Sequence, residues 1–236
     1  MSDDNNVPFP DNENLYEGIN AQTMNFGPYV MGVKLPTAFV DELYDRGLGL
    51  KNDAREQLAG HLQKEHLYTR EDKEWFIKEV GPVFSHYRAG HEQYHGLNTF
   101  MAENNPGVTF NVQMKLESLW INFMREGEFN PPHTHSKDLS FVIYLKLPDW
   151  QEELDNHVAN SPKPGSILFK NELDNYPQEM QWKTQQVKVY PHVGVMWIFP
   201  ALLTHMVYPY KTPGERVSVS GNITYVNRSE FPKHYF

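Results

Sequence analysis

The sequence predicts an α+β fold in which helices precede a β-rich half. Between Thr37 and Tyr94 the apolar residues recur at helical spacing, as Phe39 and Leu43 do. From Val108 the period changes to two, and β-branched and aromatic residues dominate as far as Val226. Helices followed by strands, with no internal repeat, favour one domain in which the helices cover one face of a sheet.

The N-terminal part is expected to contain an arm followed by helices. Residues 1–25 are rich in Asn, Asp and Pro, so we expect an extended N-terminal arm, followed by a single domain over residues 26–236. The helical cover spans about 37–95 and should hold three helices, the second of them around Leu58 and Leu62. The third begins near Thr69, because Asp72 three residues later is typical of a capping box.

The β-structure spans about residues 108–226. Alternating residues, such as Thr109 with Asn111 against Val108 with Phe110, predict about nine short strands. Two stretches, Pro148 to Pro164 and Asn171 to Gln186, interrupt them. Long segments of this kind often flank the mouth of a site.

Composition excludes several classes of function. The formal net charge is −9 and there is no Lys/Arg run, so we expect no nucleic-acid partner. The chain has no Cys, which leaves His, Asp or Glu to hold any metal. It has no apolar run of membrane-spanning length, and its N-terminus is acidic where a signal peptide would be basic. We therefore expect a cytoplasmic protein without a membrane partner; no feature indicates its oligomeric state.

The first candidate constellation lies at the start of a predicted strand. His133 and His135 are two residues apart, so in an extended segment their imidazoles share a face. If Ser136-Lys137 forms a two-residue hairpin loop, Asp138 pairs across from His135 on that face. The same parity places Tyr144 on the pocket side of the strand. The opposite side of that strand is fully apolar and consists of Leu139, Phe141, Ile143 and Leu145.

The second constellation combines a third histidine with an arginine. His205 begins a strand after Phe199-Pro200, and Arg216 follows eleven residues later. Arg216 and Ser218 share one face with Ser220 and Asn222, and the other face is apolar. An arginine that faces a pocket lined by hydroxyl groups requires an anion.

These residues resemble the iron(II)- and 2-oxoglutarate-dependent oxygenases. That superfamily carries a His-x-Asp/Glu pair, a distal His and an Arg-x-Ser about ten residues later on a double-stranded β-helix, a jelly-roll or cupin-like fold. The similarity covers about residues 108–226. Within it, Trp120-Ile121-Asn122, Asn130-Pro131-Pro132-His133-Thr134-His135 and the strand from Leu139 to Leu145 resemble a poorly characterised bacterial and phage group.

The resemblance implies a cofactor, a cosubstrate and residue roles. It implies Fe(II) at the histidines, 2-oxoglutarate as cosubstrate, and O2 with an unidentified substrate as further partners. Arg216 and Ser218 would bind the far carboxylate of 2-oxoglutarate, with Tyr144 and Asn122 as further candidates. No catalytic residue is expected beyond the metal centre. Hydroxylation would release succinate and CO2, and family analogy suggests a peptidyl side chain such as proline as substrate.

The proximal pair departs from the superfamily pattern, because a histidine stands where the carboxylate is expected. Three assignments are open. His133, His135 and His205 bind the metal with Asp138 orienting an imidazole; Asp138 is itself the carboxylate ligand with His205 and one of the pair; or the site is a cupin-like three-His metalloenzyme without 2-oxoglutarate. Strand parity favours the first. A non-catalytic binding protein on the same fold is a further alternative.

Overall fold

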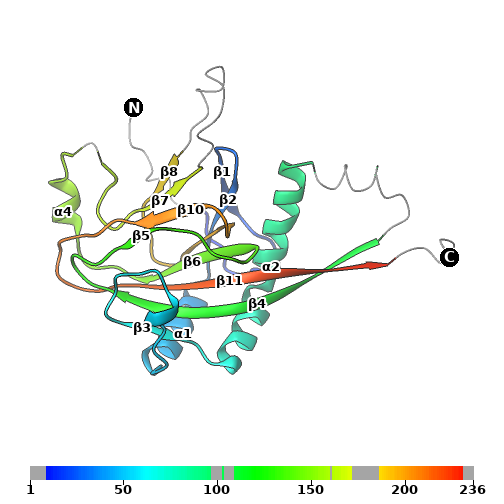
Figure 1. Ribbon diagram of the computed structural model, residues 1–236, viewed down its shortest axis with the longest axis horizontal. Coiled ribbons are helices and arrows are strands. Elements are labelled where there is room, and N and C mark those ends of the chain that lie inside the picture. Colours follow the sequence, from blue (N-terminus) through cyan, green and yellow to red (C-terminus); the bar gives the residue numbers. More distant parts are fainter. Residues whose placement is uncertain (1–8, 97–102, 104–108, 160, 172–185, 231–236) are drawn as a thin grey trace, which may run out of the picture.

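Two facing β-sheets and two long helices make up the computed structural model, which describes residues 9–96, 103, 109–159, 161–171 and 186–230 (Figure 1). The larger sheet has the strand order β1-β2-β9-β6-β11-β4-β3, and the smaller has the order β5-β10-β7-β8. All pairings within both sheets are antiparallel. This is the double-stranded β-helix that the family resemblance implies.

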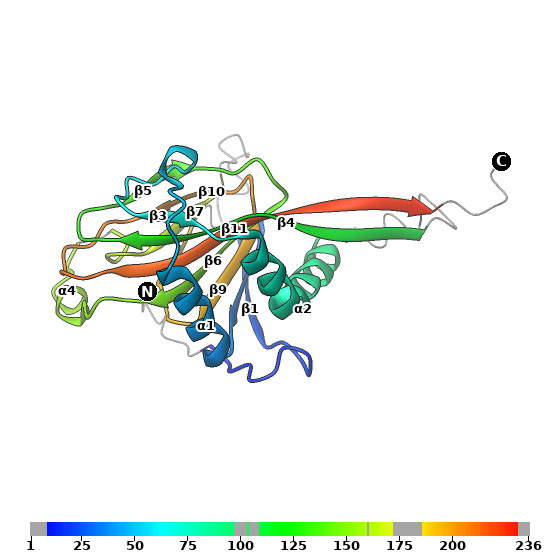
Figure 2. The same cartoon turned by 90° about the horizontal axis from the view of Figure 1, so that it is seen from below.

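The strands of the larger sheet come from both halves of the chain. Their bounds are β1 Ala21–Asn25, β2 Tyr29–Lys34, β3 Glu65–Leu67, β4 Thr109–Met124, β6 Leu139–Lys146, β9 Val195–Pro200 and β11 Arg216–Glu230. β4 and β11 pair along their whole length and extend beyond the body as a two-stranded antiparallel ribbon (Figures 1 and 2). The smaller sheet consists of β5 Asn130–His133, β7 Ile167–Lys170, β8 Gln186–Val189 and β10 Thr204–Val207.

The helices cover the outer face of the larger sheet. α1 (Thr37–Leu48) and α2 (Arg70–Tyr94) lie on the side away from β5, β7 and β10 (Figure 2). Phe76 and Phe84 of α2 contact Phe141 of β6, with ring centroids 5.3 Å apart in both pairs. A short helix, α4 (Gln151–Asp155), lies in the segment between β6 and β7. No helix in the described ranges is long and apolar enough to cross a membrane.

Each central strand serves two apolar cores, as the alternation in the sequence predicts. Leu139, Phe141, Ile143 and Leu145 join the core under the helices. Val142 and Tyr144 of the same strand belong to the core between the two sheets. Val217 and Val219 of β11 likewise face the helices, so Arg216, Ser218 and Ser220 face the interior between the sheets, where they line a pocket.

The helical prediction is wrong for the segment around Leu58 and Leu62. This stretch forms only the 3₁₀ turn η1 (Arg55–Gln57), because its backbone is bonded to neighbouring segments. The Ala54 amide donates to the Glu65 carbonyl and the His61 amide to the Phe129 carbonyl, both at 2.9 Å. These tertiary bonds replace the local ones that a helix would need.

The strand prediction agrees closely in number but is wrong in length for two strands. The described residues from Thr109 onward form eight strands, of which β4 and β11 are long. Within the predicted arm, residues 21–25 form β1, and β1 pairs with β2, which the sequence did not predict as a strand. The side chain of Asn12 fixes the part before β1, since its amide nitrogen donates to the carbonyls of Asn20 and Lys34. Residues 172–185 of the second interruption lie outside the described residues.

The predicted start of the third helix is confirmed and gives a stability test. Thr69 Oγ1 accepts from the Asp72 amide and Asp72 Oδ2 accepts from the Thr69 amide, both at 3.1 Å. Thr69→Ala should therefore lower the free energy of unfolding by about 1 kcal/mol in urea titration, and Thr69→Ser should restore it. The control is Thr37→Ala at the exposed start of α1, where no side chain caps the helix and the change should stay within about 0.5 kcal/mol. Equal losses in Thr69→Ala and Thr37→Ala would contradict the capping argument.

Candidate metal centre and anion pocket

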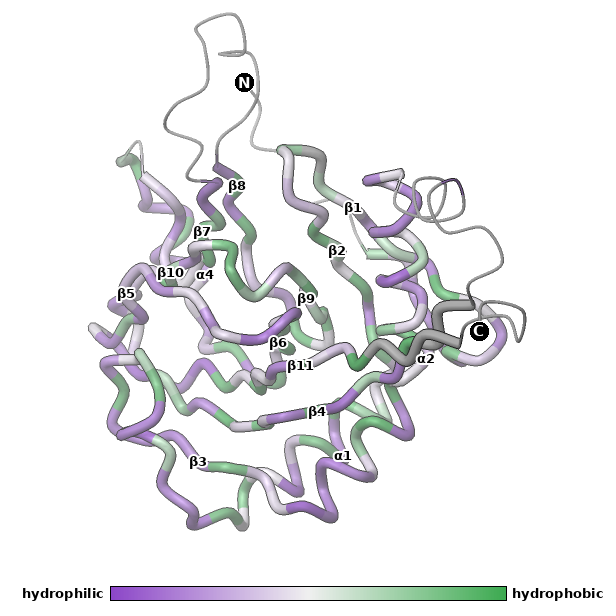
Figure 3. Tube along the Cα trace, turned by 45° about the vertical axis from the view of Figure 1, so that its right-hand side comes forward, coloured by the Kyte–Doolittle hydropathy of each residue, from purple (hydrophilic) through white to green (hydrophobic). Residues whose placement is uncertain are grey.

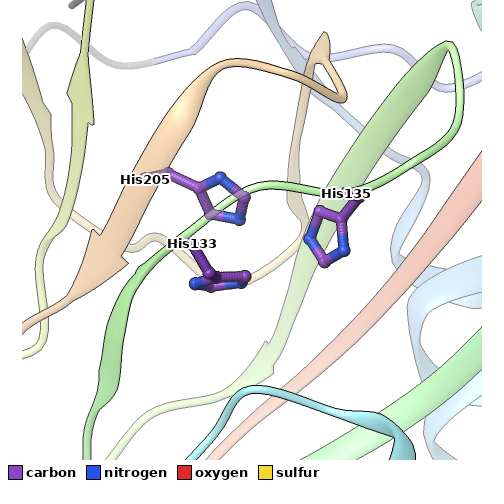
Figure 4. Close-up of side chains that lie close together, drawn as sticks. All are labelled: His133, His135 and His205. Carbon is purple, nitrogen blue, oxygen red and sulfur yellow. The ribbon is translucent and has the colours of Figure 1, made fainter.

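Three imidazoles converge between the two sheets (Figure 4). His133 ends β5, His205 lies on β10 directly opposite it, and His135 follows β5 by two residues. One nitrogen from each ring lies within 4.8 Å of the others. The ring centroids are 4.2 to 5.1 Å apart. The structure thus brings together the three histidines that the sequence selects.

Hydrogen bonds orient two of these rings toward the common centre. Nδ1 of His133 lies 2.7 Å from the Pro131 carbonyl, and Nδ1 of His205 lies 2.9 Å from the Leu203 carbonyl. Because a carbonyl only accepts, each Nδ1 carries the hydrogen and leaves Nε2 with a free lone pair.

The protonation state of the three rings also suits a metal. Burial lowers the pKa of all three, to about 4 for His135 and about 3 for His205. Neutral imidazole is the form that binds a metal cation.

Asp138 does not join this group. Oδ2 of Asp138 accepts from the Tyr225 amide at 2.7 Å, and the side chain faces a different cavity, bordered by α2. No hydrogen bond links Asp138 to an imidazole in the described part of the chain. The hairpin expectation behind that pairing is wrong: His133 pairs with His205, and the segment after it crosses from the smaller sheet to the larger one. His135 and Asp138 are therefore not cross-strand partners.

A buried cation lies in the same pocket. Arg216 is 3 % exposed, and its Nε has no hydrogen-bond partner. Its guanidinium carbon lies 4.9 Å from the ring centre of Tyr144, and Nη1 approaches Met124 Sδ at 3.5 Å. The described residues that line the pocket include no Asp or Glu. An unpaired buried guanidinium is costly, so the site favours an anionic ligand.

The remaining predicted residues form one row across the sheet beside Arg216. Asn122 of β4, Ser218 of β11 and Tyr144 of β6 are direct cross-strand partners. The Tyr144 hydroxyl and Asn122 Oδ1 are buried without a partner. The second row along on the same face, Ser118-Asn222-Ser140, is bonded throughout, with distances of 3.0 and 2.7 Å. Polar atoms without a hydrogen-bond partner are therefore found in the row that adjoins Arg216.

These residues fit an iron(II) ion and a dicarboxylate. Three neutral imidazole nitrogens suit a divalent transition metal, and the cavity between them and Arg216 is bordered by cationic or neutral groups only. Arg216 lines this cavity with an unpartnered donor, and the unpartnered hydroxyl of Tyr144 belongs to the ring beside its guanidinium, so both suit a carboxylate at that end.

Sequence reasoning missed two buried polar side chains near this pocket. Trp197 of β9, directly opposite Val142, has an indole N–H without a partner. Glu65 of β3 is a buried acid directly opposite Asn122. The alternation of Val195, Trp197 and Phe199 could have placed Trp197 on the inner face. No local pattern marks Glu65, because its significance depends on a pairing between segments far apart in the sequence.

Comparison with known proteins identifies the β-core. Residues 118–222 match the model of the family described as "Putative 2OG-Fe(II) oxygenase". No curated protein matches the chain.

Solved structures give distant similarities. A prolyl-4-hydroxylase from Pseudomonas putida is 17 % identical, with 85 % of this chain and 93 % of that chain covered and a TM-score of 0.47. A prolyl hydroxylase from Trichoplax adhaerens is 14 % identical, with 85 % and 84 % covered and a TM-score of 0.45.

The matched segment contains all three imidazoles, Arg216 and the polar row, which together hold the groups that an iron(II) ion and 2-oxoglutarate require. Over residues 118–222 the chain is therefore similar to the iron(II)- and 2-oxoglutarate-dependent oxygenases, and the residues of its site fit the metal and the cosubstrate of that family.

Proposed function

We propose that the protein hydroxylates a C–H bond of its substrate, with His133, His135 and His205 holding iron(II) and Arg216 binding the far carboxylate of 2-oxoglutarate. The observation that carries this proposal is the buried, unpaired guanidinium in the same cavity as three converging imidazoles. When bound, iron(II) and 2-oxoglutarate activate O2, so that one oxygen atom enters the substrate and the other enters succinate, with release of CO2.

The side chains of this protein bind, orient and exclude water. The Nε2 atoms of His133 and His205 would be the metal ligands, because their Nδ1 atoms are engaged by carbonyl groups. Arg216 neutralises a carboxylate, and the Tyr144 hydroxyl can donate to the same group. Val142, Ile167 and Phe199 supply apolar walls that keep water from the reacting atoms.

The substrate proposal rests on the family resemblance and on the charge of the chain. Family analogy suggests a peptidyl side chain such as proline, and the net charge of −9 favours a neutral or basic peptide over an acidic one. Of the acidic residues in the segment after β6, Glu153 is used structurally, since its carboxylate accepts from the amides of Lys211 and Thr212. A library of Pro-containing peptides, assayed for a mass increase of one oxygen atom, tests the substrate class.

A three-His metalloenzyme without 2-oxoglutarate is the second candidate. The observation in its favour is that the described metal-binding group holds three imidazoles and no carboxylate. It gives no role to the anion pocket, whereas the proposed function uses both the imidazoles and Arg216. Activity that is unchanged when 2-oxoglutarate is left out would favour this second candidate.

A metal-binding measurement on alanine variants distinguishes the three imidazoles from Asp138 as metal ligands. We expect His133→Ala, His135→Ala and His205→Ala each to lose stoichiometric iron(II) in a metal titration. Asp138→Ala should keep it, because the Asp138 carboxylate caps the Tyr225 amide. If Asp138→Ala lost as much iron as His205→Ala, Asp138 would be a ligand. Iron-replete His133→Ala and His135→Ala would reject the metal site altogether.

Cosubstrate binding tests Arg216. Removing one partner of a buried charge pair costs at least about 2 kcal/mol, so Arg216→Ala should weaken 2-oxoglutarate binding about 30-fold or more. Tyr144→Phe should weaken it about 5-fold, the effect of one lost hydrogen bond. Both are measured by calorimetry on the protein loaded with metal. The control is Arg125→Ala, which removes an exposed arginine paired with Glu215. Equal losses in Arg216→Ala and Arg125→Ala would contradict the assignment.

A further inference from the structure

A buried carboxyl group extends the polar row to the edge of the sheet. Glu65 of β3 pairs directly with Asn122 of β4, so the row reads Glu65-Asn122-Ser218-Tyr144 across four adjacent strands. Figure 3 shows β11, β4 and β3 in succession toward this edge. Directly opposed residues project to the same face with Cβ atoms about 5 Å apart. Glu65 therefore faces the same side as the residues proposed to bind 2-oxoglutarate.

Two acceptor atoms lie unpartnered at this position. Glu65 is 1 % exposed and its Oε2 has no hydrogen-bond partner, and the same holds for Asn122 Oδ1. Two buried oxygen acceptors on neighbouring strands repel each other unless a proton lies between them. The Asn122 amide nitrogen points the other way and approaches Ser220 Oγ at 3.4 Å.

The surroundings of Glu65 favour its protonated form. The charged groups that act on it are the carboxylates of Glu128 and Asp53 and the guanidinium of Arg55, and no ion pair to Glu65 exists among the described residues. Arg55 is bonded to Asp53, and its charge offsets the effect of burial and of the two carboxylates on Glu65 only in part. Burial, assisted by Glu128 and Asp53, raises the pKa of Glu65 to about 7. A neutral carboxyl group carries an O–H donor that a carboxylate lacks.

The loop before β3 holds Glu65 directly behind the pocket wall. A Cβ atom on Gly60 would lie 3.0 Å from Glu65 Oε1 and 2.9 Å from Asn130 Oδ1. Asn130 and Leu62 both line the pocket, so only the glycine backbone lets the loop close over the acid there. Glu65 thus acts on the pocket through Asn122.

We propose that Glu65 is a positioning residue: as a neutral acid it donates a hydrogen bond to Asn122 Oδ1 and thereby turns the Asn122 amide nitrogen toward the pocket. This step rests on the proposed function, in which 2-oxoglutarate occupies the pocket that Asn122 and Arg216 both line. Ionisation of Glu65 removes the donor and places a negative charge behind an anion site. Both changes weaken 2-oxoglutarate binding.

Conservative and non-conservative variants separate this role from a purely structural one. In calorimetry on the metal-loaded protein at pH 6, Glu65→Ala should weaken 2-oxoglutarate binding about 10-fold, whereas Glu65→Gln, which keeps an N–H donor, should stay within about 2-fold of the wild type. Between pH 6 and pH 8.5 the wild type should lose affinity relative to Glu65→Gln. The exposed control Glu56→Gln should follow the wild type.

Thermal unfolding of the protein without metal or cosubstrate tests the acid independently. Because the folded pKa is raised above the unfolded value of about 4.3, the wild type loses stability as the pH rises from about 4.3 to about 7. The melting temperature of Glu65→Gln minus that of the wild type should therefore increase over this pH interval. Above about pH 7 this difference should stay constant.

The two experiments distinguish a failure of the proposal about Glu65 from a failure of the proposed function. If the difference in melting temperature between the wild type and Glu65→Gln stayed constant from pH 5 to pH 8, Glu65 would not be a neutral acid in the folded protein, and the proposal would be overturned. A Glu65→Gln variant as weak as Glu65→Ala in 2-oxoglutarate binding would show that Glu65 acts as a charged acceptor, which also overturns the proposal. If the wild type bound no 2-oxoglutarate at all, the proposed function would fail, and the unfolding comparison would still decide whether Glu65 is neutral.

Discussion

The buried guanidinium of Arg216 sets the requirements for the rest of the site. It lies between two sheets, with Met124 and Tyr144 beside it and no carboxylate among the described pocket residues. Such a charge costs several kcal/mol unless an anion joins it. The three imidazoles in the same cavity are neutral and attract a cation. A dianion with one carboxylate near the metal and the other near Arg216 would satisfy both ends of the cavity, and 2-oxoglutarate has the two acidic groups that this arrangement would require.

Strand pairing places these groups, and the helices keep the strands in position. β10 pairs with β5 and brings His205 opposite His133, while the crossing from β5 to β6 carries His135 to the same point. β11 lies between β4 and β6 in the larger sheet, so one face of three neighbouring strands supplies Asn122, Ser218 and Tyr144. The other face of the same strands packs under α1 and α2. A shift of one residue in any of these strands would exchange the two faces and abolish the site.

Alternation within a strand could be read from the sequence, whereas pairing between strands could not. The inward positions of Tyr144, Arg216 and Ser218 follow from period two, because each strand has one polar and one apolar face. The predicted hairpin at Ser136-Lys137 is wrong because the choice between a local turn and a crossing to the other sheet depends on distant strands. The helix expected around Leu58 is replaced for the same reason by backbone bonds to β3 and to Phe129. Glu65 escaped notice because only the β3–β4 register gives it a partner in the site.

The most direct test of this account is a crystal structure of the protein with iron(II) and 2-oxoglutarate under anaerobic conditions, with anomalous scattering collected at the iron edge. The account predicts one iron peak bound by His133, His135 and His205, and one carboxylate of 2-oxoglutarate paired with the Arg216 guanidinium. An iron peak at Asp138, or 2-oxoglutarate bound away from Arg216, would contradict it.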